Sequence, residues 1–167
     1  MKSVEPPDQF RLSAAVGWLE LGNPVEALAE LEQISAPFQD HPDVLEARWG
    51  ILASQHRWPA ALEAARKLLQ LAPDRASAWL HHAYALRRAP DGGLRAAWQA
   101  LTPALEKFPD EPTIPYNLAC YACQLDELDA ARAFFQRAVI VGGKEHIKPL
   151  ALNDRDLEPL WDEIRGL

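Results

Sequence analysis

Two cysteines and a histidine are the residues of this sequence whose types first suggest chemistry. Cys120 and Cys123 form a C-x-x-C, whose sulfurs would share one face of a helix. A redox-active thiolate normally lies at a helix N-terminus, whereas this pair falls in the middle of an apolar helical segment, so small-residue packing explains it better. His81 could approach Cys120 from a neighbouring helix, but a closed zinc site needs four ligands and only three can be named. We expect no metal and no cofactor.

Catalytic machinery is equally hard to assemble from the sequence. The Gly92-Gly93 and Gly142-Gly143 pairs lack the preceding strand and the surrounding motif of a phosphate-binding loop. No serine or cysteine nucleophile comes with a base and an orienting group. We therefore expect a protein that is not an enzyme.

Composition and charge exclude further classes of function. The 167 residues are 49% apolar with a net charge of −7, which favours a folded domain and argues against a general nucleic-acid binder. Residues 1–46 carry −7, residues 47–109 carry +5 and residues 110–167 carry −5. The basic middle could steer a partner, or it could reflect ordinary variation among solvated faces.

Location is suggested by what the sequence lacks. No apolar run approaches the roughly 18 residues that a membrane-spanning helix needs, and the first eight residues have no apolar stretch typical of a signal peptide. Two cysteines provide no disulfide framework. We expect a cytoplasmic protein with no membrane partner.

The elements that must position these residues are amphipathic helices. Residues 25–34 place apolar side chains on one face and three glutamates on the other, and residues 60–71 repeat this arrangement. Gly22-Asn23-Pro24 ends one helix and starts the next, with proline at the first helical position. Few stretches alternate with a period of two, so we expect no sheet.

These helices recur in four segments of about 34 residues, the tetratricopeptide period. The segments are residues 8–41, 42–75, 76–111 and 112–144. Their small, large and aromatic positions are occupied, for example, by Ala15, Trp18, Gly22 and Ala27 in the first segment, Ala61, Ala65, Leu68 and Pro73 in the second, Trp79, Ala83, Ala97 and Pro109 in the third, and Tyr116, Ala119, Ala131, Phe135 and Ala138 in the fourth.

This pattern resembles the tetratricopeptide-repeat (TPR) family and covers nearly the whole chain, and a similar tail follows the last repeat in some bacterial members. It departs from the family where His56 and Asp126 replace the usual turn glycine, and where Trp49 replaces a small residue. Pro103 lies inside a predicted helix at residues 94–107, so we expect a kink or break near residues 100–102. The six tryptophans are most simply explained by packing between helices.

The last segment, residues 145–167, is not a fifth repeat. Asn153-Asp154 is a plausible N-cap, and it precedes apolar residues that fit one helical face, namely Leu157, Leu160, Trp161 and Ile164. We expect a helix that caps the exposed apolar edge of the last repeat. The resemblance thus implies an all-α, right-handed solenoid of about four TPR helix pairs with a C-terminal capping helix.

The resemblance also implies a function. The first helix of each pair would line a concave face, and the side chains there that suit a peptide or a carboxylate are His81, Tyr84, Arg87, Arg88, Tyr116, Asn117 and Cys120. The groove could equally be a solvated surface without a ligand. The carboxylate clamp of some members is not expected, because Leu12, Val16 and Ala47 occupy the positions of its polar residues.

We therefore expect a scaffold that binds an unidentified protein or peptide. The alternative is a chaperone-like or assembly factor that shields a client protein. A weak homo-oligomer could form through the first repeat, near residues 4–21, because no N-terminal cap is evident.

Overall fold

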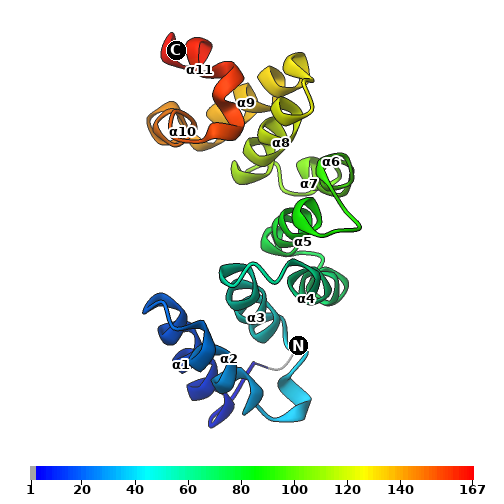
Figure 1. Ribbon diagram of the computed structural model, residues 1–167, viewed down its shortest axis with the longest axis vertical. Coiled ribbons are helices and arrows are strands. Elements are labelled where there is room, and N and C mark those ends of the chain that lie inside the picture. Colours follow the sequence, from blue (N-terminus) through cyan, green and yellow to red (C-terminus); the bar gives the residue numbers. More distant parts are fainter. Residues whose placement is uncertain (1–2) are drawn as a thin grey trace. The chain divides into compact units, whose positions relative to one another are not determined.

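A computed structural model describes residues 3–167 of the chain, and within this range every regular element is helical (Figure 1). The chain divides into two compact units, one ending at Pro90 and the other beginning at Asp91. None of the described helices is both long and apolar enough to span a membrane. The absence of strands confirms the all-α prediction for the described residues.

The first unit consists of antiparallel helices that pack on their neighbours in sequence: α1 on α2, α3 on α4 and α4 on α5. Its elements are α1 (Asp8–Glu20), α2 (Pro24–Glu32), the 3-10 helix η1 (Ala36–Phe38), α3 (Pro42–Ser54), α4 (Trp58–Leu71) and α5 (Ala76–Arg88). Asn23 starts α2, because its side chain accepts a hydrogen bond from the Glu26 amide and Pro24 follows it.

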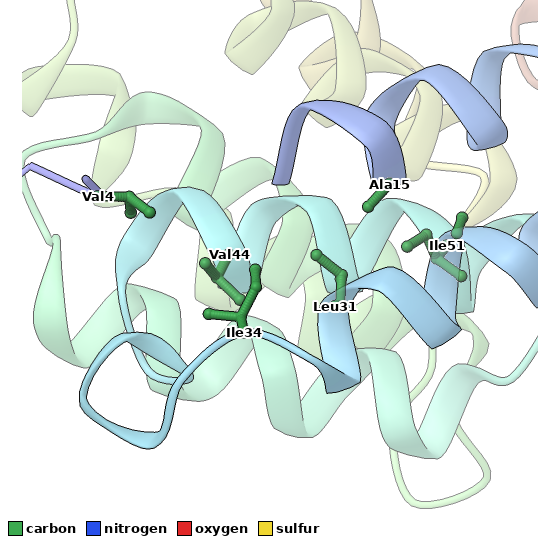
Figure 2. Close-up of a cluster of buried hydrophobic side chains, with 7 residues drawn as sticks. Val4, Ala15, Leu31, Ile34, Val44 and Ile51 are labelled. Atoms are coloured by element: carbon green, nitrogen blue, oxygen red, sulfur yellow. The ribbon is translucent and has the colours of Figure 1, made fainter. Parts of the chain in front are cut away.

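One core cluster of this unit forms where α1, α2 and α3 converge. Apolar side chains from these helices and from the segment before α1 point toward one another (Figure 2), and they are Val4, Ala15, Ala27, Leu31, Ile34, Val44 and Ile51. The buried Asp8 carboxylate ties the start of α1 to the start of η1, because it accepts hydrogen bonds from the amide and the hydroxyl of Ser35. These bonds hold the pKa of Asp8 below its usual value.

The second unit is built around the α8–α9 pair. Its elements are α6 (Leu94–Leu101), α7 (Ala104–Lys107), α8 (Thr113–Gln124), α9 (Leu128–Gly142), α10 (Lys144–Ala151), the 3-10 helix η2 (Arg155–Leu160) and α11 (Trp161–Arg165). The break predicted at Pro103 is confirmed, since α6 ends at Leu101 and α7 begins at Ala104. Proline has no amide hydrogen to continue the α-helical ladder.

The C-terminal segment is helical as predicted, but it forms three short pieces instead of one capping helix. Asp154 is an N-cap, because its carboxylate accepts a hydrogen bond from the Asp156 amide, and the element it starts is the 3-10 helix η2. Pro159 within η2 cannot supply an α-helical hydrogen bond. The predicted apolar face is nevertheless buried at Leu157, Leu160 and Ile164.

Candidate binding site

A cluster of rings and one guanidinium lies on the face where α5 meets α3 and the start of α4. Helix α5 contributes His81, Tyr84 and Arg88, which lie at i, i+3 and i+7 and therefore share one face. Trp49 comes from α3 and Trp58 from the first residue of α4. We call these five residues the ring cluster.

Ring stacking fixes the geometry of this cluster. His81 stacks on Trp49 with ring centroids 3.8 Å apart and planes 13° apart. Tyr84 meets Trp49 edge-on at 5.9 Å and lies 5.9 Å from Trp58. The Arg88 Cζ atom lies 3.6 Å from the centroid of the Tyr84 ring and 5.3 Å from that of Trp58, which is the geometry of a cation–π contact.

The charge of Arg88 is not neutralised within its own unit. Its Nη1 donates to the backbone oxygen of Tyr84 at 3.1 Å, and no described carboxylate of the first unit lies within ion-pair distance of it. Arg75 differs, because it pairs with Asp43 at 2.6 Å and with Glu46 at 3.3 Å. A guanidinium has five donors, so Arg88 retains donors for an external acceptor.

The opposite end of the cluster is buried. The Nε1 of Trp49 and the Nδ1 of His81 are buried and have no hydrogen-bond partner. Burial lowers the pKa of His81, and the nearby Glu46 carboxylate only partly opposes this effect. His81 is therefore neutral near pH 7 and acts as a flat packing surface for Trp49. Tyr84, by contrast, is 37% exposed.

The predicted site residues divide between the two units. His81, Tyr84, Arg87 and Arg88 lie on α5 of the first unit, where Arg87 is partly buried beside Arg88. Tyr116, Asn117 and Cys120 lie on α8 of the second unit. Each set is therefore considered with its own neighbours.

On α8, two of the three predicted residues bond to the C-terminal segment of the chain itself. The Tyr116 hydroxyl donates to the Asp154 carboxylate at 3.1 Å, and the Cys120 thiol donates to the same oxygen at 3.5 Å. The Asn117 amide donates to the Thr113 backbone oxygen at 3.0 Å. Burial raises the pKa of Tyr116, and Cys120 is only 2% exposed. Cys120 therefore supports the C-terminal segment, and we leave it out of the proposed site.

The neighbourhood of Cys120 also bears on metal binding. Donor atoms of Cys120, Asp154 and Asp156 lie within 4.8 Å of one another. Hydrogen bonds within the chain account for this proximity, because the Asp154 carboxylate accepts from Tyr116, from Cys120 and from the Asp156 amide. Cys123, the other free cysteine, is also buried, and burial raises its pKa to about 11. Both cysteines are therefore placed for packing, and we assign no metal to them.

Comparison with solved structures places this architecture among known folds. TTC0263, described as a thermophilic TPR protein in Thermus thermophilus, matches 94% of this chain and 82% of its own, with a TM-score of 0.75 and 19% identity. This chain has the tetratricopeptide-repeat fold. No protein-family model matches the chain, and no curated protein matches its sequence.

Two structures of MamA share the TPR fold of this chain. MamA 41-end from Desulfovibrio magneticus RS-1 matches 99% of this chain and 97% of its own, with a TM-score of 0.72 and 17% identity. The MamA RS-1 ArsTM double mutant matches 86% of this chain and 79% of its own, with a TM-score of 0.71 and 15% identity. At such identities the likeness concerns the fold and not the ligand.

A groove of about 580 Å³ lies on another surface of the first unit, between α2 and α4. Its floor is apolar, with Leu28, Leu45 and Leu52. Charged groups at its rim are already engaged: Lys67 pairs with Asp40 at 2.9 Å, and Arg48 donates to Gln39 at 2.6 Å. The ring cluster is the better candidate, because it holds the Arg88 guanidinium over the exposed Tyr84 ring and beside the partly exposed Trp58 ring.

Sequence reasoning identified part of the ring cluster. His81, Tyr84 and Arg88 were selected, whereas Trp49 and Trp58 were assigned to packing, with Trp58 expected to be partly exposed. Two features pointed to these tryptophans, since Trp49 occupies a position where the repeat has a small residue, and Trp58 precedes a proline at a helix start. Their meeting at Tyr84 depends on how α3, α4 and α5 pack.

Proposed function

We propose that the chain is a protein-interaction module that binds a segment of another protein along the ring cluster. The observation that supports this most is the Arg88 guanidinium, which lies over the Tyr84 ring without an acidic partner in its unit. Tyrosine, tryptophan and arginine are the residues that most often dominate binding energy at interfaces. The TPR fold supplies packed helices on which such side chains are held before the ligand arrives.

The chemistry of the cluster specifies a ligand. Arg88 can donate two parallel hydrogen bonds to a carboxylate. The exposed parts of Tyr84 and Trp58 can cover an apolar or aromatic side chain beside that carboxylate. The preferred ligand is therefore an acidic segment in which a carboxylate adjoins an apolar residue. A further contact is proposed at Arg87, with His81 as the support of Trp49.

Peptide arrays test this proposal directly. The chain would be probed against matched peptides in which an acidic residue beside an aromatic residue is kept, neutralised or replaced by lysine. We expect the acidic peptides to bind best and to bind less well as salt rises, because a partly exposed ion pair is screened. A factor that shields apolar clients would instead bind the neutralised peptides at least as well as the acidic ones.

Variants at Arg88 localise the effect. Arg88→Ala should weaken binding of the acidic peptides by about tenfold or more, the usual worth of a charged hydrogen bond. Arg88→Lys should restore only part of the affinity, because an ammonium cannot bind bidentately. The control is Arg66→Ala, which removes an equal charge from α4, where Arg66 pairs with Glu63. Equal binding by Arg88→Ala and the unaltered chain would refute the proposed site.

A further inference from the structure

Helix α1 has a second apolar face that residues 3–167 leave partly exposed. Five residues follow one another at i, i+4, i+7, i+8 and i+11, which places them on one side of the helix. They are Phe10, Ala14, Gly17, Trp18 and the C-cap residue Leu21. The exposed fractions of the three large side chains are 68% for Phe10, 38% for Trp18 and 78% for Leu21. The core of the unit receives a different face of α1, through Ala15, Leu12 and Leu19.

Gly17 lies in the middle of this outer face, and packing within the chain does not require a glycine there. A Cβ atom at Gly17 would meet nothing within 4 Å, whereas one at Gly50 would lie 3.3 Å from the Leu19 side chain. Glycine disfavours a helix interior. A small residue at this position is useful when another helix approaches closely, with Ala14 one turn away.

The spacing of the face is self-complementary. If two α1 helices pack antiparallel about a point between Ala15 and Val16, Phe10 of one copy lies opposite Leu21 of the other, and Ala14 lies opposite Gly17. Large residues then pack at both ends while small residues let the helix backbones approach at the centre. An interface in which the same patch serves both partners is the kind that closes a twofold dimer.

We propose that this outer face of α1 binds a second copy of the chain, helix against antiparallel helix. The face carries no charged side chain, and Arg11 at its border already pairs with Glu30 at 2.8 Å. Residues 1–46 carry a net charge of −7, so two copies repel at a distance. Salt should therefore strengthen this association, whereas it weakens binding of acidic peptides at Arg88.

The association should be weak. A helix of 13 residues is about 20 Å long, and one helix face buries less than the roughly 1,200 Å² typical of a stable interface. Sedimentation velocity over a wide concentration range should show a monomer at low concentration and a dimer at high concentration. A strict monomer at every concentration and salt level would overturn the proposal.

Two variants of α1 test the surface. Gly17→Leu should abolish dimerisation, because its side chain fills the space that the second helix needs. It should not lower the melting temperature of the monomer, since that space is open and leucine favours a helix. Gln9→Leu adds the same side chain to an exposed position off the face and should leave dimerisation unchanged. A dimer that survives Gly17→Leu would contradict the proposed contact.

Cross-linking tests the antiparallel register. Chains with Phe10→Cys and chains with Leu21→Cys would be oxidised separately and as a mixture. The proposal expects a disulfide in the mixture only, because like positions lie at opposite ends of the paired helices. The native cysteines are buried and should not interfere. Efficient disulfides within either separate sample would overturn the antiparallel register.

Discussion

His81 shows how burial sets the behaviour of a single residue in the ring cluster. It lies flat on Trp49, and its Nδ1 is buried without a partner, so the charged imidazolium is disfavoured and the pKa is lowered. The folded chain therefore takes up this proton less readily than the unfolded chain does. The contribution of the neutral His81 ring to the free energy of unfolding is complete above about pH 6.5, the ordinary histidine pKa. This contribution is lost as the pH falls toward the pKa of His81 in the folded chain.

We predict that His81→Phe reduces the acid sensitivity of folding. Phenylalanine keeps the stacked ring but cannot bind a proton, so the free energy of unfolding should fall less between about pH 7.5 and pH 5 than in the unaltered chain. Urea unfolding at several pH values measures this. His82, whose pKa burial also lowers, should account for a remaining part. His146→Phe is the exposed control, and an identical pH dependence in all three proteins would contradict the assignment.

The inter-helix turns give a second prediction at the residue scale. His56 and Asp126 occupy positions where the repeat pattern usually has glycine, and both have left-handed backbones, with φ of 56° and 61°. Asp126 is exposed, so little else depends on its side chain. We predict that Asp126→Gly stabilises the chain by up to about 1 kcal/mol, because glycine adopts this conformation without steric cost.

Thermal and urea unfolding would measure the effect of Asp126→Gly. Asp126→Ala serves as its control, because alanine also lacks the carboxylate but is strained at positive φ, so it should not stabilise the chain. A lower stability of Asp126→Gly than of the unaltered chain would show that the carboxylate, not the backbone, determines the turn.

At the scale of elements, the corner between α9 and α10 depends on close packing. A Cβ atom at Gly142 would lie 2.8 Å from Pro112 and 2.8 Å from Ile147. Gly142→Ala should therefore destabilise the chain by about 1–3 kcal/mol, the usual cost of overpacking. Gly17→Ala is the matched control in an open helical position, and at concentrations where the chain is monomeric it should raise stability by about 0.5–1 kcal/mol. If denaturant unfolding showed the same change in the free energy of unfolding for Gly142→Ala and Gly17→Ala, the close packing at Gly142 would be contradicted.

The elements differ in how far the sequence could predict them. The break between α6 and α7 follows from the missing amide hydrogen of Pro103, which is a local property, and it was predictable. Helix α10 was not predicted, because it has only eight residues and contains Pro149, so its apolar pattern is too short to show a period. The η2 segment was expected to be α-helical, because Leu157, Leu160 and Ile164 fit one helical face, but it contains Pro159 and is a 3-10 helix.

At the scale of the whole molecule, contacts between residues distant in the sequence could not be predicted from local sequence patterns. Tyr116 and Cys120 were expected to face a ligand, yet both hydrogen-bond to Asp154, more than 30 positions later in the chain. Trp49 and Trp58 join Tyr84 through the packing of three helices. Repeat spacing indicates which helices exist and which faces are apolar, but side-chain pairing between helices depends on their packing.

Binding of an acidic segment at the ring cluster is the central proposal for this protein. The most direct measurement is an NMR titration of the labelled chain with the best acidic peptide from the array, following the tryptophan indole N–H signals. The Trp58 signal should shift, while that of Trp161, whose indole N–H donates to the Ala151 backbone oxygen, should not. Backbone shifts confined to the α2–α4 groove or to the second unit, with Trp58 unchanged, would contradict the claim.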